Sequence, residues 1–229
     1  MAISFKGHQF SKDIILMGVR WYVGYALSYR DIEELLAERG VEVDHATIQR
    51  WVLKYAPELK KNFSTYKKGV STSWRMDETY IKVKGQWTYQ YRAVDKQGNT
   101  VDFMLSKKRD EAAATAFFKK AITSSGLPEK VVIDKSGSNI AAIENINLLL
   151  FIYGLGLLMI EDVQVKYLNN IVEQDHRFIK KITKPMKGFK SFESAASTLD
   201  GIELHHMLKK NQANMKQTSV HEQFYALAA

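Results

Sequence analysis

The chain has 229 residues, of which 45% are hydrophobic and 25% charged, a balance typical of a folded protein of one or two domains. Its formal net charge of +8 is compatible with a polyanionic partner, but charge alone does not identify a nucleic-acid-binding protein. The absence of cysteine excludes disulfide bonds, thiolate zinc sites and a thiol nucleophile. The start of the chain lacks the short apolar core of a signal peptide.

The first part of the chain is predicted to be helical. Apolar residues recur at helical spacing over residues 14–25, which indicates a first helix. Ser28 is followed three residues later by Asp31, a variant of the capping box, and this pair predicts a second helix over residues 29–39.

A third helix gives this region the pattern of a helix-turn-helix motif. Asp44 is expected to cap it, and Pro57 is expected to follow its end near residue 55. Two helices joined by a tight turn can place the second helix in the DNA major groove. The residues expected on its outer, DNA-binding face are His45, Thr47, Gln49, Arg50 and Lys54. A helical module that binds another protein is the alternative for this segment.

After a short basic segment, the apolar periodicity changes from that of helices to that of strands. The predicted elements are a strand that ends at a Gly85-Gln86 turn, strands at 87–94 and 100–105, a helix at 110–123, a strand at 130–134, a helix, a strand at 157–160 and a helical C-terminus. This order is that of an RNase H-like α/β domain. The uncharged stretch 146–160 is shorter than the roughly 20 residues that span a membrane, so we interpret it as a buried helix end, a turn and a buried strand.

Three acidic residues lie where this order of elements would bring them together. Asp77 lies on the first, central strand, Asp134 ends the fourth strand, and Glu173 lies on a helix that packs near both. Ligands of open α/β sheets collect at the carboxyl edge of the strands. Carboxylates from several elements suit two divalent cations that support phosphoryl transfer. The alternative is a chance triple among 25 acidic residues, and Glu78 is interpreted as outward-facing or as a neighbour of the metal ligands.

The helix that carries Glu173 is strongly basic. His176 shares the face of Glu173, and residues 177–190 include six basic residues and no acidic one. A carboxylate within a cationic face suits a site that binds metal ions and DNA phosphates together. A solvated basic helix is the alternative. The expected DNA contacts on this segment are Arg177, Lys180, Lys181 and Lys184.

Motifs along nearly the whole chain resemble those of a known family. They include Val19-Arg20-Trp21-Tyr22, Ser28-Tyr29-Arg30-Asp31, Arg50-Trp51-Val52, Trp74-Arg75-Met76-Asp77-Glu78-Thr79-Tyr80, Tyr91-Arg92-Ala93-Val94-Asp95, Lys166-Tyr167-Leu168-Asn169-Asn170, Glu173-Gln174-Asp175-His176 and Gly188-Phe189-Lys190-Ser191. The chain resembles the DDE transposases of bacterial insertion sequences, in the replicative, cointegrate-forming group called insertion-sequence family six. One departure is that the stretch between Asp134 and Glu173 is a few residues longer than expected for the family, with the surplus in the apolar segment 146–160.

The resemblance implies a catalytic site and a reaction. Asp77, Asp134 and Glu173 would be the catalytic triad and hold two Mg²⁺ or Mn²⁺ ions, and Lys180 would contact the DNA end. The implied reaction is a metal-assisted transesterification without a covalent enzyme intermediate. Alternatives are a metal-dependent nuclease of the same fold, or a DNA-binding repressor whose integrase-like domain is inactive.

The resemblance also implies partners and a division of the chain. The helix-turn-helix would bind the terminal inverted repeats, with Gln49 and Arg50 as base readers. Partners would be double-stranded DNA, as element ends and target, and further copies in a homodimer or higher oligomer on DNA, with no membrane. The protein would be cytoplasmic and nucleoid-associated when bound to DNA. The expected division is an all-α helix-turn-helix domain at 1–58, a basic linker at 59–72, an RNase H-like (integrase-type) α/β catalytic domain with a mixed five-stranded sheet at 73–210, and a tail at 211–229.

Overall fold

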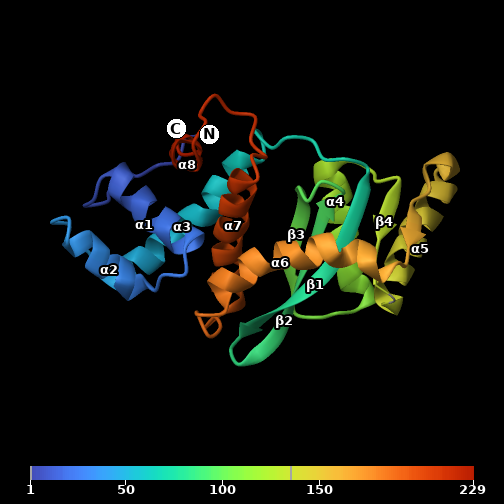
Figure 1. Cartoon of the computed structure of the whole chain (residues 1–229), viewed down its shortest axis with the longest axis horizontal. Helices are drawn as coiled ribbons and strands as arrows, with labels where there is room; N and C mark the ends of the chain where they lie inside the picture. Colours follow the sequence, from blue (N-terminus) through green and yellow to red (C-terminus); the bar gives the residue numbers. More distant parts are fainter. Residues whose placement is uncertain (1, 135) are drawn as a thin grey trace. The chain divides into compact units, whose positions relative to one another are not determined.

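The computed structural model describes residues 2–134 and 136–229, and the chain forms two compact units (Figure 1). One unit comprises the residues up to Lys68 together with Phe178–Ala229, and the other is Gly69–Arg177. These units divide the chain differently from the boundaries expected at residues 58, 72 and 210, because the last two helices belong to the unit that contains the N-terminus. The assignment of functions to the segments 1–58, 59–72, 73–210 and 211–229 stays a prediction.

The first unit is helical. Its complete helices are α1 (Lys12–Gly24), α2 (Tyr29–Ala37), α3 (His45–Phe63), α7 (Phe192–Lys209) and α8 (Val220–Ala226). The capping box that predicted α2 is present, since the Asp31 amide donates to Ser28 Oγ at 3.1 Å and the Ser28 amide donates to Asp31 Oδ2 at 2.7 Å. Helix α7 packs along α3 and α1, and all three helices carry buried apolar side chains.

Helix α3 continues through Pro57 to Phe63, so the expectation that this proline marks the end of the helix is wrong. A proline inside a helix costs about 3 kcal/mol. Beyond it, the side chains of Leu59 and Phe63 are almost fully buried. Burying two such side chains contributes about 1.5–3 kcal/mol each, which offsets the cost of the proline. The first residues of the expected linker are therefore helical.

The second unit is built on a mixed five-stranded sheet. Its elements are β1 (Ser73–Val83), β2 (Gln86–Asp95), β3 (Thr100–Ser106), α4 (Glu111–Ser125), β4 (Lys130–Val132), α5 (Gly137–Ile152), the 3₁₀ turns η1 (Gly156–Leu158) and η2 (Lys166–Asn169), and β5 (Glu161–Val163), with α6 (Asn170–Thr183) leading into the first unit. The strand order is β3-β2-β1-β4-β5, in which β2 is antiparallel to β1 and β3, whereas β4 is parallel to β1 and β5. This is the RNase H-like topology, and the predicted fold class is confirmed.

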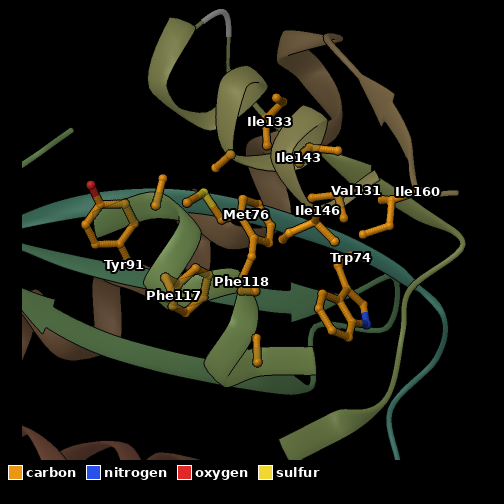
Figure 2. Close-up of a cluster of buried hydrophobic side chains, with 14 of the residues drawn as sticks. Trp74, Met76, Tyr91, Phe117, Phe118, Val131, Ile133, Ile143, Ile146 and Ile160 are labelled. Carbon is orange, nitrogen blue, oxygen red and sulfur yellow. The ribbon is translucent and has the colours of Figure 1, made fainter. Parts of the chain in front are cut away.

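The two faces of β1 have different roles. Trp74 and Met76 point into an apolar core formed with α4 and α5, which Figure 2 shows between the sheet and these helices. Asp77 points to the opposite face because successive strand residues alternate. The N-terminal half of α6 crosses that opposite face (Figure 1), where His176 approaches Asp77. The central strand thus separates the apolar core on one face of the sheet from a charged layer on the other face, formed by Asp77 and the residues of α6 that approach it.

The interpretation of residues 146–160 as buried is wrong for most of the segment. Ile146 and Ile160 at its two ends are buried, and Asn147 joins them by hydrogen bonds to the amide and carbonyl of Ile160, at 2.8 Å and 2.9 Å. Most of the large apolar side chains between them are exposed, whereas Leu150 packs against the core. The fifth strand forms at Glu161–Val163 rather than at 157–160. No helix among the described residues is both long enough and apolar enough to cross a membrane.

Candidate active site

Asp77 is held at the middle of the central strand. Its side chain is 22% exposed, and its Oδ2 lies 3.6 Å from Nδ1 of His176 on α6. Alternation in β1 explains the position, since the neighbours Met76 and Glu78 must point to the core side of the sheet. Asp77 therefore faces the layer between the sheet and α6.

Asp134 follows β4 directly, in the turn that leads into α5. Its Oδ1 accepts hydrogen bonds from the Ser136 amide and from Nδ2 of Asn139, each at 3.2 Å. Its Oδ2 accepts a hydrogen bond from Nη2 of Arg109 at 3.2 Å. Because β4 is parallel to β1 and next to it, this turn opens beside the middle of β1.

Glu78 joins this cluster, so its interpretation as outward-facing is wrong. Its side chain is only 3% exposed. Asn139 Nδ2 donates to its Oε1 at 3.1 Å, and Arg109 Nη2 donates to its Oε2 at 3.2 Å. Arg109 and Asn139 therefore each connect Glu78 to Asp134. The sequence held a signal for this position, since Trp74 and Met76 mark one face of the first half of this strand as core-facing and Glu78 is the next residue on that face.

The three carboxylates Asp77, Glu78 and Asp134 lie together. One oxygen from each is within 4.8 Å of the others. Glu173, in the first turn of α6, is exposed and does not belong to this tight group. Its negative charge nevertheless contributes to raising the pKa of Asp77, so it lies within electrostatic range of the cluster.

Burial and mutual repulsion set the electrostatics of the cluster. Burial raises the pKa of Asp77 to about 6, and the charges of Glu78, Asp134 and Glu173 add to the increase. Burial also raises the pKa of Glu78, while Arg109 and Asn139 oppose that shift. A site that crowds like charges favours a bound cation. The ligand atoms are all carboxylate oxygens, so the residues fit a hard divalent cation such as Mg²⁺ or Mn²⁺.

The stability of the metal-free protein is expected to fall as the pH rises from about 4 to above 6. The pKa of Asp77 in the folded chain lies above its ordinary value of 3.8, so the folded state binds more protons in this window and loses stability on deprotonation. The loss is on the order of 2–3 kcal/mol. Asp77→Asn is expected to remove much of this pH dependence and to stabilise the metal-free protein at neutral pH.

Thermal melting in a chelator, at pH values below and above 6, measures this effect. Asp162→Asn is the matched control because Asp162 lies on β5 and is exposed. An unchanged pH dependence in Asp77→Asn would show that another group carries the titration.

Helix α6 is anchored to the sheet by a buried ion pair that sequence reasoning missed. Arg92 on β2 lies directly opposite Asp77 and is completely buried. Its Nη2 lies 2.7 Å from Oδ2 of Asp175 on α6. Asp175 and His176 thus both contact the charged layer of the sheet, one turn or less from Glu173. The ion pair fixes the part of the helix that carries the third expected carboxylate.

The expected DNA-binding residues of α3 divide into two groups. Arg50 and Lys54 are exposed, and Nη2 of Arg50 donates to Thr47 Oγ1 at 2.7 Å. His45 and Gln49 line a cavity of about 690 Å³, and the residues that also line it include Pro185, Met186, Gly188, Phe189 and Lys190. His45 Nδ1 also lies 3.1 Å from Oε2 of Glu33. The basic residues Arg177, Lys180, Lys181 and Lys184 are all exposed.

An RNase H-like sheet with clustered carboxylates on and beside its central strand defines a class of metal-dependent enzymes that act on nucleic acids. Comparison with known proteins narrows this class. Residues 71–212 match the family DDE_Tnp_IS240, described as a DDE domain. The chain belongs to this family of insertion-sequence DDE transposases, which are polynucleotidyl transferases.

Individual relatives agree with the family. The chain is 43% identical over 213 residues to the transposase for insertion sequence-like element IS431mec of Staphylococcus aureus, over 93% of this chain and 92% of that protein. The transposase for IS257 in transposon Tn4003 of Staphylococcus aureus has the same identity and coverage. Among solved structures, the HTLV-2 integrase catalytic core domain in complex with magnesium (dimeric form) aligns with a TM-score of 0.45 and 17% identity, over 69% of this chain and 99% of that chain.

Proposed function

We propose that the protein binds the terminal inverted repeats of its insertion sequence, cleaves the DNA there and transfers the 3′-hydroxyl end to target DNA. The observation that carries this proposal is that Asp77 on the central strand β1 lies close to Asp134 in the turn after β4, with Glu173 on α6, the helix that crosses the sheet. The family supports the same activity. Its substrate would place the protein in the bacterial cytoplasm, on the nucleoid when bound.

The residues that would hold divalent cations are Asp77, Asp134 and Glu173. When bound, Mg²⁺ or Mn²⁺ supplies the Lewis acidity that activates the attacking oxygen and stabilises the departing one. The protein's own groups set the geometry. Asn139 and Arg109 orient the Asp134 carboxylate, whereas His176 lies beside Asp77. Because Arg109 contacts Asp134 directly, it also offers a positive charge at the edge of the cluster, where a phosphate would approach.

A strand-transfer assay tests the proposed reaction. Labelled duplex that ends in the element's terminal repeat is mixed with plasmid target and Mg²⁺ or Mn²⁺. Label joined to the plasmid is the expected result. Cutting without joining would instead support a nuclease of the same fold, and binding without either reaction would support a repressor.

The helix-turn-helix is proposed to read the terminal repeat through α3. Arg50→Ala is expected to weaken binding to the repeat by roughly 5- to 150-fold, because a good side-chain contact to a base edge contributes about 1–3 kcal/mol. Gln49→Ala is expected to act in the same direction. Both should relax the preference for the repeat over a scrambled duplex, which fluorescence anisotropy at fixed salt measures.

Lys216→Ala is the control for the loss of charge, since Lys216 is exposed on the same unit and lies outside α3. It should change the affinity for both duplexes slightly and equally. If Arg50→Ala behaves like this control, Arg50 contacts only phosphates or no DNA at all.

A further inference from the structure

The end of α5 and the turn that follows it expose an unusually apolar surface. Nine large apolar side chains in this segment, here called the apolar tip, are between 41% and 102% exposed: Leu148, Leu149, Phe151, Ile152, Tyr153, Leu155, Leu157, Leu158 and Met159. In Figure 1 the labelled helix α5 lies beyond β4 at the edge of its sheet. A fully exposed side chain of this size offers about 150–200 Å², so the tip exposes on the order of 1,000 Å².

The apolar tip has a defined backbone conformation. Gly154 ends α5 with a φ of +74°, and the Leu155 amide donates to the Leu150 carbonyl at 2.8 Å. The Leu158 amide donates to the Leu155 carbonyl at 2.9 Å, and Asn147 fixes the return of the chain at Ile160. These bonds are typical of a helix C-terminus closed by a glycine. The side chains are therefore presented by an ordered turn.

The size of the tip matches an interface. The largest apolar patch on an ordinary monomer covers about 300–600 Å². Stable protein interfaces bury about 800 Å² on each partner. The apolar tip thus exceeds what a monomer usually exposes and reaches what a dimer needs.

The charged residues that flank the tip favour a protein partner over a lipid surface or DNA. The tip itself is uncharged, and the nearest charged residues along the chain, Glu144, Glu161 and Asp162, are acidic and exposed, with Glu161 paired to Lys130 at 3.0 Å. Segments that bind anionic lipid surfaces or DNA carry basic flanks. Acidic flanks disfavour both of these surfaces and leave an apolar protein surface as the complementary partner.

We propose that the apolar tip of one copy packs against the apolar tip of a second copy and forms a two-fold dimer without DNA. Each copy carries the same uncharged patch, which is the condition for an isologous interface. The identity of the partner rests on the proposed function, since joining two element ends requires two active sites in one assembly.

Helix α5 would connect the dimer interface to the carboxylates. Its first turns carry Asn139, which holds both Glu78 and Asp134, and its last turn carries the tip. A helix of 16 residues is about 24 Å long. Each active site would therefore lie one helix length from the two-fold axis, on a rigid element.

Sedimentation velocity of the full chain without DNA, over a range of concentrations, tests the proposal. The variant is the double substitution Tyr153→Glu and Leu157→Glu. These side chains are 77% and 102% exposed, so they contribute little to the fold of the monomer. Wild type should dimerise, and the variant should dimerise at least about a hundredfold more weakly, because burying unpaired charges in an apolar interface is costly.

Trp87→Glu is the control, since Trp87 is 59% exposed on β2 and lies outside the tip. It should dimerise like wild type, and circular dichroism should show the same fold for all three proteins. A wild type that stays monomeric, or a double variant that dimerises like wild type, would overturn the proposal. Binding of wild type, but not of the variant, to phosphatidylglycerol vesicles without any dimer would overturn it in favour of a lipid surface. Because no DNA is present, failure here leaves the strand-transfer result untouched.

Discussion

Asp134→Asn is expected to lower strand transfer by on the order of a thousandfold or more while binding of the terminal repeat stays close to wild type. The substitution removes one negative charge from the carboxylate cluster and keeps the shape of the side chain. The amide oxygen of the asparagine can still accept from Ser136 and Asn139, as Asp134 Oδ1 does. The Asp134 side chain is 41% exposed, so the substitution should destabilise the fold only slightly. A lower rate of strand transfer would then reflect the catalytic step and not unfolding.

Asp162→Asn is the matched control for this experiment. It makes the same chemical change on the neighbouring strand β5, where the side chain is exposed and lies outside the cluster of Asp77, Glu78 and Asp134. Its strand transfer should equal that of wild type. If Asp134→Asn also transfers normally, the Asp134 carboxylate holds no essential metal ion, and Glu78, already within the cluster, becomes the ligand to test next.

Local chemistry explains which parts of the fold could be predicted. The capping box of Ser28 and Asp31 closes within three residues, and the alternation around Asp77 is a property of one strand. Neither depends on a distant partner. The order of strands and helices then suffices for the RNase H-like topology.

Long-range packing explains two of the errors. Nothing near Pro57 in the sequence shows that Leu59 and Phe63 are buried in the helical unit, and that burial carries α3 past the proline. For residues 146–160 the error runs the other way, because burial was predicted and the structure exposes most of the side chains. An apolar run predicts that the side chains avoid water, but it does not distinguish a core of the same chain from a surface that another molecule covers.

The hairpin register explains why Arg92 was missed. The turn between β1 and β2 is Lys84-Gly85, both with positive φ (49° and 79°), rather than the predicted Gly85-Gln86. A two-residue turn of this kind fixes which residues pair. The observed turn places Arg92 opposite Asp77, whereas the predicted turn would place Val94 there. The direct pairing of Arg92 with Asp77 across β1 and β2 follows from this register.

Arg92→Met is expected to destabilise the protein by about 3–5 kcal/mol, because it removes the buried guanidinium that pairs with the largely buried Asp175 carboxylate. Arg92 is completely buried and the Asp175 side chain is 11% exposed, so solvent screens the pair weakly. Asp175→Leu should have a similar effect. Denaturant unfolding followed by circular dichroism measures both losses.

The double variant Arg92→Met with Asp175→Leu distinguishes two causes of the lost stability: the broken ion pair and the loss of side-chain packing. Replacing both charges by apolar groups should recover much of the stability, since neither charge is then buried in the absence of the other. Glu161→Gln is the control, because it breaks the exposed pair of Lys130 and Glu161 at 3.0 Å and should cost less than about 1 kcal/mol. If the two single losses simply add in the double variant, Arg92 and Asp175 are not coupled.

The same double variant also tests how Glu173 is positioned. Asp175 lies on α6 two residues from Glu173, so its ion pair with Arg92 can position Glu173 through the backbone of the helix. If the ion pair only stabilises the fold, the double variant should recover strand transfer together with stability. If the pair fixes the angle of α6, stability should return while strand transfer stays low, and the affinity for Mn²⁺ should fall with it. The second result is the one we expect, because a carboxylate on a helix can complete a metal site only where that helix is held.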